Sequence, residues 1–141
     1  MGIKLNKVQV FFHSDKRRTI RDVTLPEGMG FPFIVRQFKT ITLSNTAVKQ
    51  GLAIGNHYHT MESHRWEFYV VVGEEDFPLF RFRFRGAGEK DFHEQEMTAG
   101  DACIIPPMHS HAFLALRPGV QLFGFSDCPY RSEDDVLDKL F

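Results

Sequence analysis

The segment GLAIGNHYHTMESHRWEFYVVVG (51–73) gathers three histidines, His57, His59 and His64, just before an apolar run. On a strand, residues two apart leave the backbone by the same face. His57 and His59 can therefore chelate one ion or place a base beside a substrate. This spacing raises the question of whether another part of the chain supplies further ligands.

A second histidine pair lies in GDACIIPPMHSHAFL (100–114), where His109 and His111 are again two residues apart. The pair follows an apolar stretch and two prolines, which stiffen the chain as it enters the pair. Imidazole nitrogen suits Fe, Zn, Ni, Cu or Mn, whereas Ca²⁺ and Mg²⁺ prefer oxygen ligands. Two such pairs in one chain indicate a shared site more strongly than either pair does alone.

Apolar residues that alternate with polar ones predict the strands that position these histidines. Turn sequences such as PEGMG, RGAGEKD and TAGD separate the strands, and the fifteen phenylalanines suit strands and cores. The predicted strands are 7–12, 19–25, 32–44, 47–54, 65–72, 78–85, 92–98, 101–106, 111–117 and 120–126. Strands of this number and spacing predict an all-β sandwich or barrel.

The final segment, SEDDVLDKLF (132–141), is predicted to be a short C-terminal helix. Ser132 can cap its first turn, where acidic residues are favoured by the helix dipole. Its apolar residues, Val136, Leu137 and Leu140, would then face inward. We expect this helix to pack over one end of the barrel.

The segment FRFRFR (80–85) alternates strictly, so its phenylalanines share one face and its arginines share the other. The favoured interpretation puts the phenylalanines in the core and the arginines in solvent. The alternative places one of Arg81, Arg83 and Arg85 at a pocket mouth, where it would hold a phosphate or a carboxylate.

Length and charge limit the classes of function. A chain of 141 residues fits a single domain, 1–141, and its formal net charge of −1 favours neither nucleic acid nor an anionic membrane as a partner. The N-terminal sequence does not resemble a secretion signal, and no apolar run has the length of a membrane span. The two cysteines, Cys103 and Cys128, do not form a disulfide framework. These features predict a soluble, cytoplasmic protein.

The first histidine segment resembles the first conserved pattern of the cupins. That pattern is Gly, five residues, His-x-His, three or four residues, Glu, six residues and Gly. Gly51, His57 and His59 match its opening. At the spacing of its Glu this chain has His64, after four intervening residues.

The second segment resembles the second cupin pattern, which is Gly, five residues, Pro-x-Gly, two residues, His, three residues and Asn. Gly100, Pro106 and His111 match it, whereas Met108 stands at its second Gly and Ala115 at its Asn. The joint resemblance covers roughly residues 30–127. It implies an RmlC-like jelly-roll barrel, a double-stranded β-helix, in a single domain.

The resemblance implies a metal site when the ligand positions of the family are carried over. The set obtained is His57, His59, His64 and His111, which would bind a divalent Zn, Fe, Ni, Cu or Mn ion. Glu62 and Glu67 are the two alternatives to His64. His109 either lines the same pocket or lies in the turn.

A second resemblance is to cupins that act on dTDP-4-keto sugars, namely 3,5-epimerases and 3,4-ketoisomerases. It rests on GNHYH, on the opening DKRRTI and on the tail LFGFSDCPYRSEDDVLDKLF. Arg18 stands where that group has Gly. Ile54 stands where it has an Arg that helps to hold the nucleotide diphosphate.

The chemistry of that second group needs no metal. A histidine removes the proton next to a keto group, and a tyrosine or second histidine returns a proton. Here His57 or His59 would be the base. Tyr130, Tyr69 and Tyr58 are the candidate acids, with Tyr58 the weakest because it points away from its histidine neighbours on a regular strand.

Three functions follow from the sequence. The first is a metal-binding cupin that acts on a small sugar-like or keto substrate by isomerisation or oxygenation. The second is a metal-free nucleotide-sugar isomerase or epimerase of polysaccharide biosynthesis, and the third is a non-catalytic ligand-binding barrel. The histidine number favours the first, and we expect a homodimer because cupins of this length usually pair.

Overall fold

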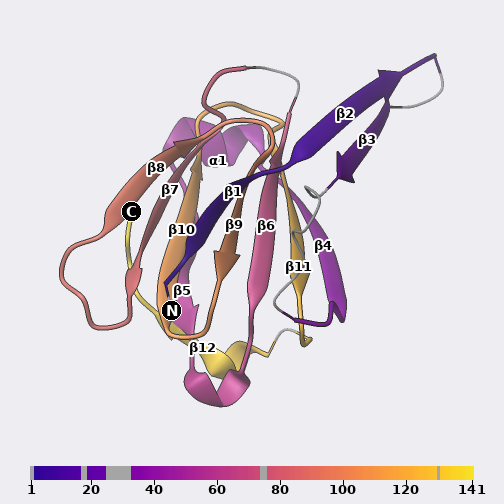
Figure 1. The fold of residues 1–141 in the computed structure, drawn as a ribbon. Helices are drawn as coiled ribbons and strands as arrows, with labels where there is room; N and C mark the ends of the chain where they lie inside the picture. Colours follow the sequence, from indigo (N-terminus) through magenta and orange to yellow (C-terminus); the bar gives the residue numbers. More distant parts are fainter. Residues whose placement is uncertain (1, 17–18, 25–32, 74–75, 130) are drawn as a thin grey trace.

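The computed structural model describes residues 2–16, 19–24, 33–73, 76–129 and 131–141, and its described strands form two five-stranded antiparallel sheets and a hairpin (Figure 1). The first sheet has the strand order β1 (Lys4–Lys7), β9 (Asp101–Ile105), β6 (Glu67–Val72), β11 (Gln121–Ser126) and β4 (Gln37–Thr42). The second has the order β12 (Asp135–Leu137), β5 (Ile54–His59), β10 (His109–Ala115), β7 (Phe80–Gly86) and β8 (His93–Met97). The hairpin pairs β2 (Gln9–Ser14) with β3 (Thr19–Thr24).

Strands far apart in the sequence lie side by side in both sheets. In the second sheet β5 pairs with β10, and in the first sheet β6 lies between β9 and β11. This order is that of a jelly roll, so the predicted all-β double-stranded β-helix is confirmed. Figure 1 shows the β2–β3 hairpin projecting away from the two packed sheets.

Strand β6 explains why the run EFYVVV is apolar throughout, because it is buried on both faces. Tyr69 and Val71 face the core between the sheets, where they join Leu79, Phe80, Phe82, Met97, Cys103, Ile105, Phe113 and Leu122. Phe68, Val70 and Val72 belong to a second core, with Val8, Ala102 and Ile104. Successive side chains of β6 point to opposite faces of the sheet, so this one strand contributes to both apolar cores.

The strand predicted at 47–54 is wrong in its first part, which forms the helix α1 (Asn45–Gln50). The Ser44 side chain accepts a hydrogen bond from the Ala47 amide at 3.1 Å, and Gly51 ends the helix with φ of 63°. These are an N-cap and a left-handed C-cap, and together they override the short apolar alternation. No helix in the described ranges is both long and apolar enough to span a bilayer.

Two other strands depart most from their predicted bounds. The strand predicted at 7–12 is interrupted at Val8, whose amide donates to the Gly100 carbonyl at 2.7 Å. The strand predicted at 32–44 is shorter, because β4 covers 37–42.

The C-terminal helix predicted over 132–141 is also wrong. Residues Ser132–Asp134 form a single 3-10 turn, and Asp135–Leu137 form β12, which pairs with β5. The Asp138 amide then donates to the carbonyl of Asn56 at 2.9 Å. The edge of β5 offers hydrogen-bonding partners to the backbone N–H and C=O groups of this segment. Pairing with β5 therefore prevails over the helical pattern of the sequence.

The segment 80–85 follows the favoured interpretation for Phe80 and Phe82, whereas Arg83 and Arg85 are mostly covered and ion-paired instead of lying in solvent. Phe80 and Phe82 are fully buried. On the opposite face, the Arg83 Nε lies 2.6 Å from Glu94 Oε2, and Arg85 pairs with Asp138. The described cavities contain none of the three arginines in their linings.

Candidate functional site

The two histidine pairs meet because β5 and β10 are neighbours. His57 and His111 are directly opposite in the register, and their ring centroids are 4.9 Å apart. The ring centroid of His59 is 4.8 Å from that of His57 and 5.8 Å from that of His111. Three imidazoles therefore converge on the space between the sheets, as the sequence predicted for these three.

A local distortion of β5 makes this approach feasible. The register shifts between His111 and Ala112, and both Gly55 (φ 89°) and Asn56 (φ 58°) are in the left-handed region. A Cβ atom on Gly55 would lie only 2.5 Å from the His111 carbonyl oxygen. Only glycine fits this position, which brings the backbone of β5 against that of β10.

The fourth member of the cluster is Glu67, at the start of β6 in the opposite sheet. Its Oε1 lies 2.8 Å from His59 Nε2 and 3.4 Å from His111 Nε2. One ligand atom from each of His57, His59, Glu67 and His111 lies within 4.8 Å of every other. In the ligand set implied by the cupin pattern, Glu67 is only an alternative to His64.

His64 lies outside this cluster, and so does Glu62. Both are exposed, and His64 ends the 3-10 turn Met61–Ser63 with φ of 50°. That turn takes up residues between β5 and β6, so the first acidic side chain to reach the interior is that of Glu67. The sequence did contain one signal for Glu67. Extra residues follow His59, and they place the buried acidic side chain further along the chain than the cupin pattern does.

The second carboxylate oxygen of Glu67 is surrounded by donors. Oε2 accepts from the Tyr69 hydroxyl at 2.7 Å, from Lys39 Nζ at 3.1 Å and from Arg65 Nη2 at 3.3 Å. Glu67 and Arg65 are 1% and 2% exposed. This arrangement fixes the carboxylate so that Oε1 alone is directed at the histidines.

The electrostatics of the cluster keep Glu67 ionised and Tyr69 protonated. Burial by itself would raise the pKa of Glu67, but hydrogen bonds from His111 and His59 and the charge of Lys39 hold it well below the usual value. Burial, followed by the nearby charge of Glu67, raises the pKa of Tyr69 well above its usual value.

The outer nitrogens of the histidines also have partners. His59 Nδ1 lies 2.7 Å from Asp135 Oδ1, and His57 Nδ1 lies 3.4 Å from Asp135 Oδ2. His111 Nδ1 lies 3.1 Å from the His109 carbonyl oxygen. Such contacts hold imidazoles in one orientation and direct the Nε2 atoms of His59 and His111 toward Glu67.

His57 is the most accessible of the three histidines. Its side chain is 25% exposed, whereas those of His59 and His111 are 3% and 2% exposed. Burial, together with the neighbouring His111, lowers the pKa of His57 from 6.5 to about 4. His57 is therefore neutral at physiological pH, as a metal ligand or a proton acceptor must be.

A cavity of about 130 Å³ opens beside the cluster. Its polar lining consists of Lys39, His57, Tyr69 and His111, and its apolar lining consists of Ile41, Ile54, Gly55 and Phe113. A few convergent polar groups against an apolar wall are typical of a ligand site.

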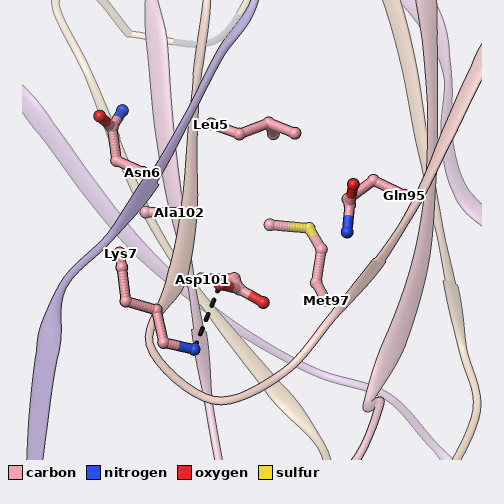
Figure 2. Close-up of a pocket in the computed structure, with 7 residues that line it drawn as sticks. All are labelled: Leu5, Asn6, Lys7, Gln95, Met97, Asp101 and Ala102. Carbon is pink, nitrogen blue, oxygen red and sulfur yellow. Dashed lines mark hydrogen bonds and ion pairs between the residues drawn. The ribbon is translucent and has the colours of Figure 1, made fainter.

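A larger cavity of about 260 Å³ lies between β1, β9 and the edge strand β8, away from the histidines (Figure 2). Figure 2 shows Leu5 and Met97 across the cavity from each other and the Lys7 ammonium paired with Asp101, at 3.2 Å. This cavity contains no member of the histidine cluster.

The remaining predicted residues lie elsewhere. The His109 Nδ1 is 2.9 Å from the Pro107 carbonyl oxygen, and His109 is not part of the cluster. Met108, which replaces a glycine of the cupin pattern, has φ of 62° and so retains the conformation that glycine favours. Tyr130 lies outside the described residues.

No protein-family model and no curated protein matches the sequence. Comparison with solved structures did give matches. One similar structure is a sugar 3,4-ketoisomerase from Thermoanaerobacterium thermosaccharolyticum in complex with TDP, with 15% identity, a TM-score of 0.65, and coverage of 96% of this chain and 87% of that one. Another is a TDP-quinovose 3,4-ketoisomerase from Campylobacter jejuni, with 11% identity, a TM-score of 0.69, and coverage of 96% and 92%.

A third similar structure is a dTDP-4-dehydrorhamnose 3,5-epimerase from Bacillus anthracis with TDP and pyrophosphate bound. It has 16% identity, a TM-score of 0.68, and coverage of 94% of this chain and 76% of that one. Likeness at these identities shows the fold, which is the RmlC-like cupin jelly roll. The resemblance seen in the sequence is confirmed at this level, and activity must be argued from the site.

Proposed function

We propose that this chain is a metal-dependent enzyme that binds one divalent transition metal through His57, His59, Glu67 and His111. The observation that carries the proposal is the convergence of four ligand atoms within 4.8 Å on a buried site. Three imidazoles and one carboxylate suit Fe, Zn, Ni, Cu or Mn. The proposed set replaces His64, which the family pattern implied, with Glu67.

The surroundings of the four side chains support metal binding. Glu67 is ionised, His57 is neutral, and one oxygen of Glu67 is occupied by donors so that the other faces the histidines. Asp135 and the His109 carbonyl hold the outer nitrogens of the histidines. Carboxylate or carbonyl partners of this kind orient metal-binding histidines in known sites.

We propose that the substrate is a small polar molecule with a keto group, which reacts in the 130 Å³ cavity. A bound divalent metal polarises a carbonyl or hydroxyl oxygen. Tyr69 stays protonated and holds Glu67, and Ile41, Ile54 and Phe113 exclude water from one side of the cavity. Lys39 supplies a positive charge at the polar side.

A second candidate function is metal-free proton transfer on a nucleotide sugar. The similar structures are two sugar 3,4-ketoisomerases and a dTDP-4-dehydrorhamnose 3,5-epimerase. The observation that favours it here is the contact of Asp135 with both His57 and His59. His57 faces the cavity as a neutral imidazole and would accept the proton, while Asp135 stabilises the charge that it gains. Tyr69 lines the same cavity as His57.

Elemental analysis of protein purified without a histidine tag separates the two candidates. We expect about one transition metal per chain. A blank that persists after reconstitution would contradict the proposal and favour the metal-free candidate. If the metal-free candidate is right, a dTDP-sugar at 100 times its Kd should raise the free energy of unfolding by about 2.7 kcal/mol.

We also propose a cytoplasmic homodimer. Phe38 is 58% exposed and contacts Phe123 and Phe125 on the first sheet, and this aromatic face would pack against a second copy. The free thiols of Cys103 and Cys128 suit a reducing compartment. Light scattering on the purified protein should give twice the chain mass, and a monomer would contradict this part of the proposal.

A further inference from the structure

Lys39 is placed between the metal-ligand cluster and the cavity. It lies on β4, its side chain is 32% exposed, and it lines the 130 Å³ cavity. Its Nζ is 3.1 Å from Glu67 Oε2 and 5.0 Å from the ring centroid of Tyr69. The long side chain of Lys39, from the edge strand β4, thus brings a positive charge to the lining of the cavity.

Glu67 Oε2 has two partners besides Lys39, namely Arg65 and Tyr69. Arg65 is almost fully buried and already neutralises Glu67, and Tyr69 supplies the shortest hydrogen bond to the same oxygen. An ammonium has three donors, and Glu67 accounts for one of them. Lys39 therefore keeps donors for a ligand in the cavity.

The sheet makes room for Lys39 at Gly124. Gly124 is opposite Lys39 on one side and opposite Tyr69 on the other. A Cβ atom at Gly124 would lie 2.9 Å from Lys39 Cε and 2.8 Å from Tyr69 Cε1. The absence of a side chain at Gly124 allows the Lys39 stem to lie across β11 toward Tyr69.

The charge of the complete site would favour an anion. Lys39 and Arg65 balance Glu67 and Asp135, so a divalent ion held by the cluster leaves a net charge of about +2 with neutral histidines. This step rests on the proposed metal. The cavity has a volume of about 130 Å³. Its apolar wall of Ile41, Ile54 and Phe113 suits a short carbon chain.

We propose that Lys39 is the anion-binding residue of this cavity and that the ligand class is a small 2-oxo or 2-hydroxy carboxylate. The carboxylate accepts a charge-assisted hydrogen bond from Lys39, and the carbon chain lies against the apolar wall. The oxygen on the adjacent carbon faces the histidine cluster. Lys39 thereby selects acids over neutral amides of the same shape.

The test is calorimetric titration on metal-analysed protein with oxalate, which mimics the carboxylate and adjacent oxygen of the proposed ligands, and with its neutral diamide, oxamide. We expect K39Q to bind oxalate about ten- to one hundred-fold more weakly than the wild type, because a hydrogen bond between charged groups is lost. K39R should recover much of the affinity. K7Q, which removes a lysine from the pair with Asp101 outside the cluster, should bind as the wild type does.

The possible results separate this inference from the proposed function. Equal affinity of K39Q and wild type for oxalate, or binding of oxamide as tight as that of oxalate, would overturn the role of Lys39 even when the metal is present. Oxalate binding that depends on Lys39 in protein that stays without metal after reconstitution would support Lys39 and contradict the metal proposal. Thermal melting of K39Q and K39R shows whether each variant is folded before titration.

Discussion

Asp135 Oδ1 lies 2.7 Å from His59 Nδ1, which links the end of the chain to the centre of the barrel. Asp135 begins β12, and the register places it directly opposite His59 on β5. The same carboxylate reaches His57 Nδ1 at 3.4 Å through its other oxygen. One acidic residue of the final strand therefore orients two of the proposed metal ligands.

Replacing Asp135 by Ala should weaken metal binding by about ten- to one hundred-fold, because the outer partner of two ligating histidines is lost. Competition with a chelator of known affinity measures the change. D134A is the matched control, since the side chain of Asp134 pairs with Arg131 outside the cluster. Equal metal affinity of D135A and D134A would show that Asp135 does not position the histidines.

His57 and His64 can be compared by the same substitution, to Asn. We expect H57N to lose the metal, because His57 is a member of the converging set. H64N should keep about one metal per chain, because His64 is exposed and Asn tolerates its left-handed backbone. Elemental analysis of both variants measures this, and an empty site in H64N would restore His64 as a ligand.

Gly55 is expected to be intolerant of any side chain. G55A combines an unfavourable positive φ with a Cβ placed 2.5 Å from the His111 carbonyl oxygen. Strain of this kind costs about 1–3 kcal/mol before the steric clash is added. Urea unfolding should show a larger loss of unfolding free energy for G55A than for G88A, whose φ is 85° but whose Cβ would meet nothing within 4 Å. Equal losses would contradict the close approach of β5 and β10.

Asp138 should make the stability of the protein depend on pH. The hydrogen bond from Arg85 is the main cause that lowers the pKa of Asp138 below its ordinary 3.8, and a hydrogen bond from Ser110 adds to it. A carboxylate with a lowered pKa in the folded state contributes stability that is present above pH 3.8 and is lost as the pH falls through its folded value.

The difference in unfolding free energy between wild type and D138N should therefore be full at pH 7 and should shrink below pH 3.8. Urea unfolding of both proteins at several pH values measures it. A difference that stays constant with pH would show that Asp138 is not held as an anion by Arg85.

Local periodicity predicted the all-β fold class, and the resemblance to the two cupin patterns implied a residue set that includes three of the four converging side chains. His57 and His59 are two apart on one strand, and His111 follows a turn at a recognisable distance. Glu67 could not be chosen over His64 from the sequence, because the choice depends on how a 3-10 turn takes up the residues between β5 and β6.

Other features depended on pairing between distant segments. Asp135 was expected in the first turn of a helix, and its role became visible only when β12 was found to pair with β5. Lys39 was not singled out, since nothing in its own segment indicates that Gly124 lies opposite and leaves room for it. Contacts of this kind are set by sheet register, which a single sequence does not specify.

The central claim is that one divalent metal is held jointly by His57, His59, Glu67 and His111. Its most direct test is a crystal structure of metal-reconstituted protein with data collected on both sides of the absorption edge of that metal. We expect an anomalous difference peak within about 2.0–2.2 Å of a nitrogen of each histidine and of Glu67 Oε1. A peak at His64 or at the surface, or no peak between the four side chains, would contradict it.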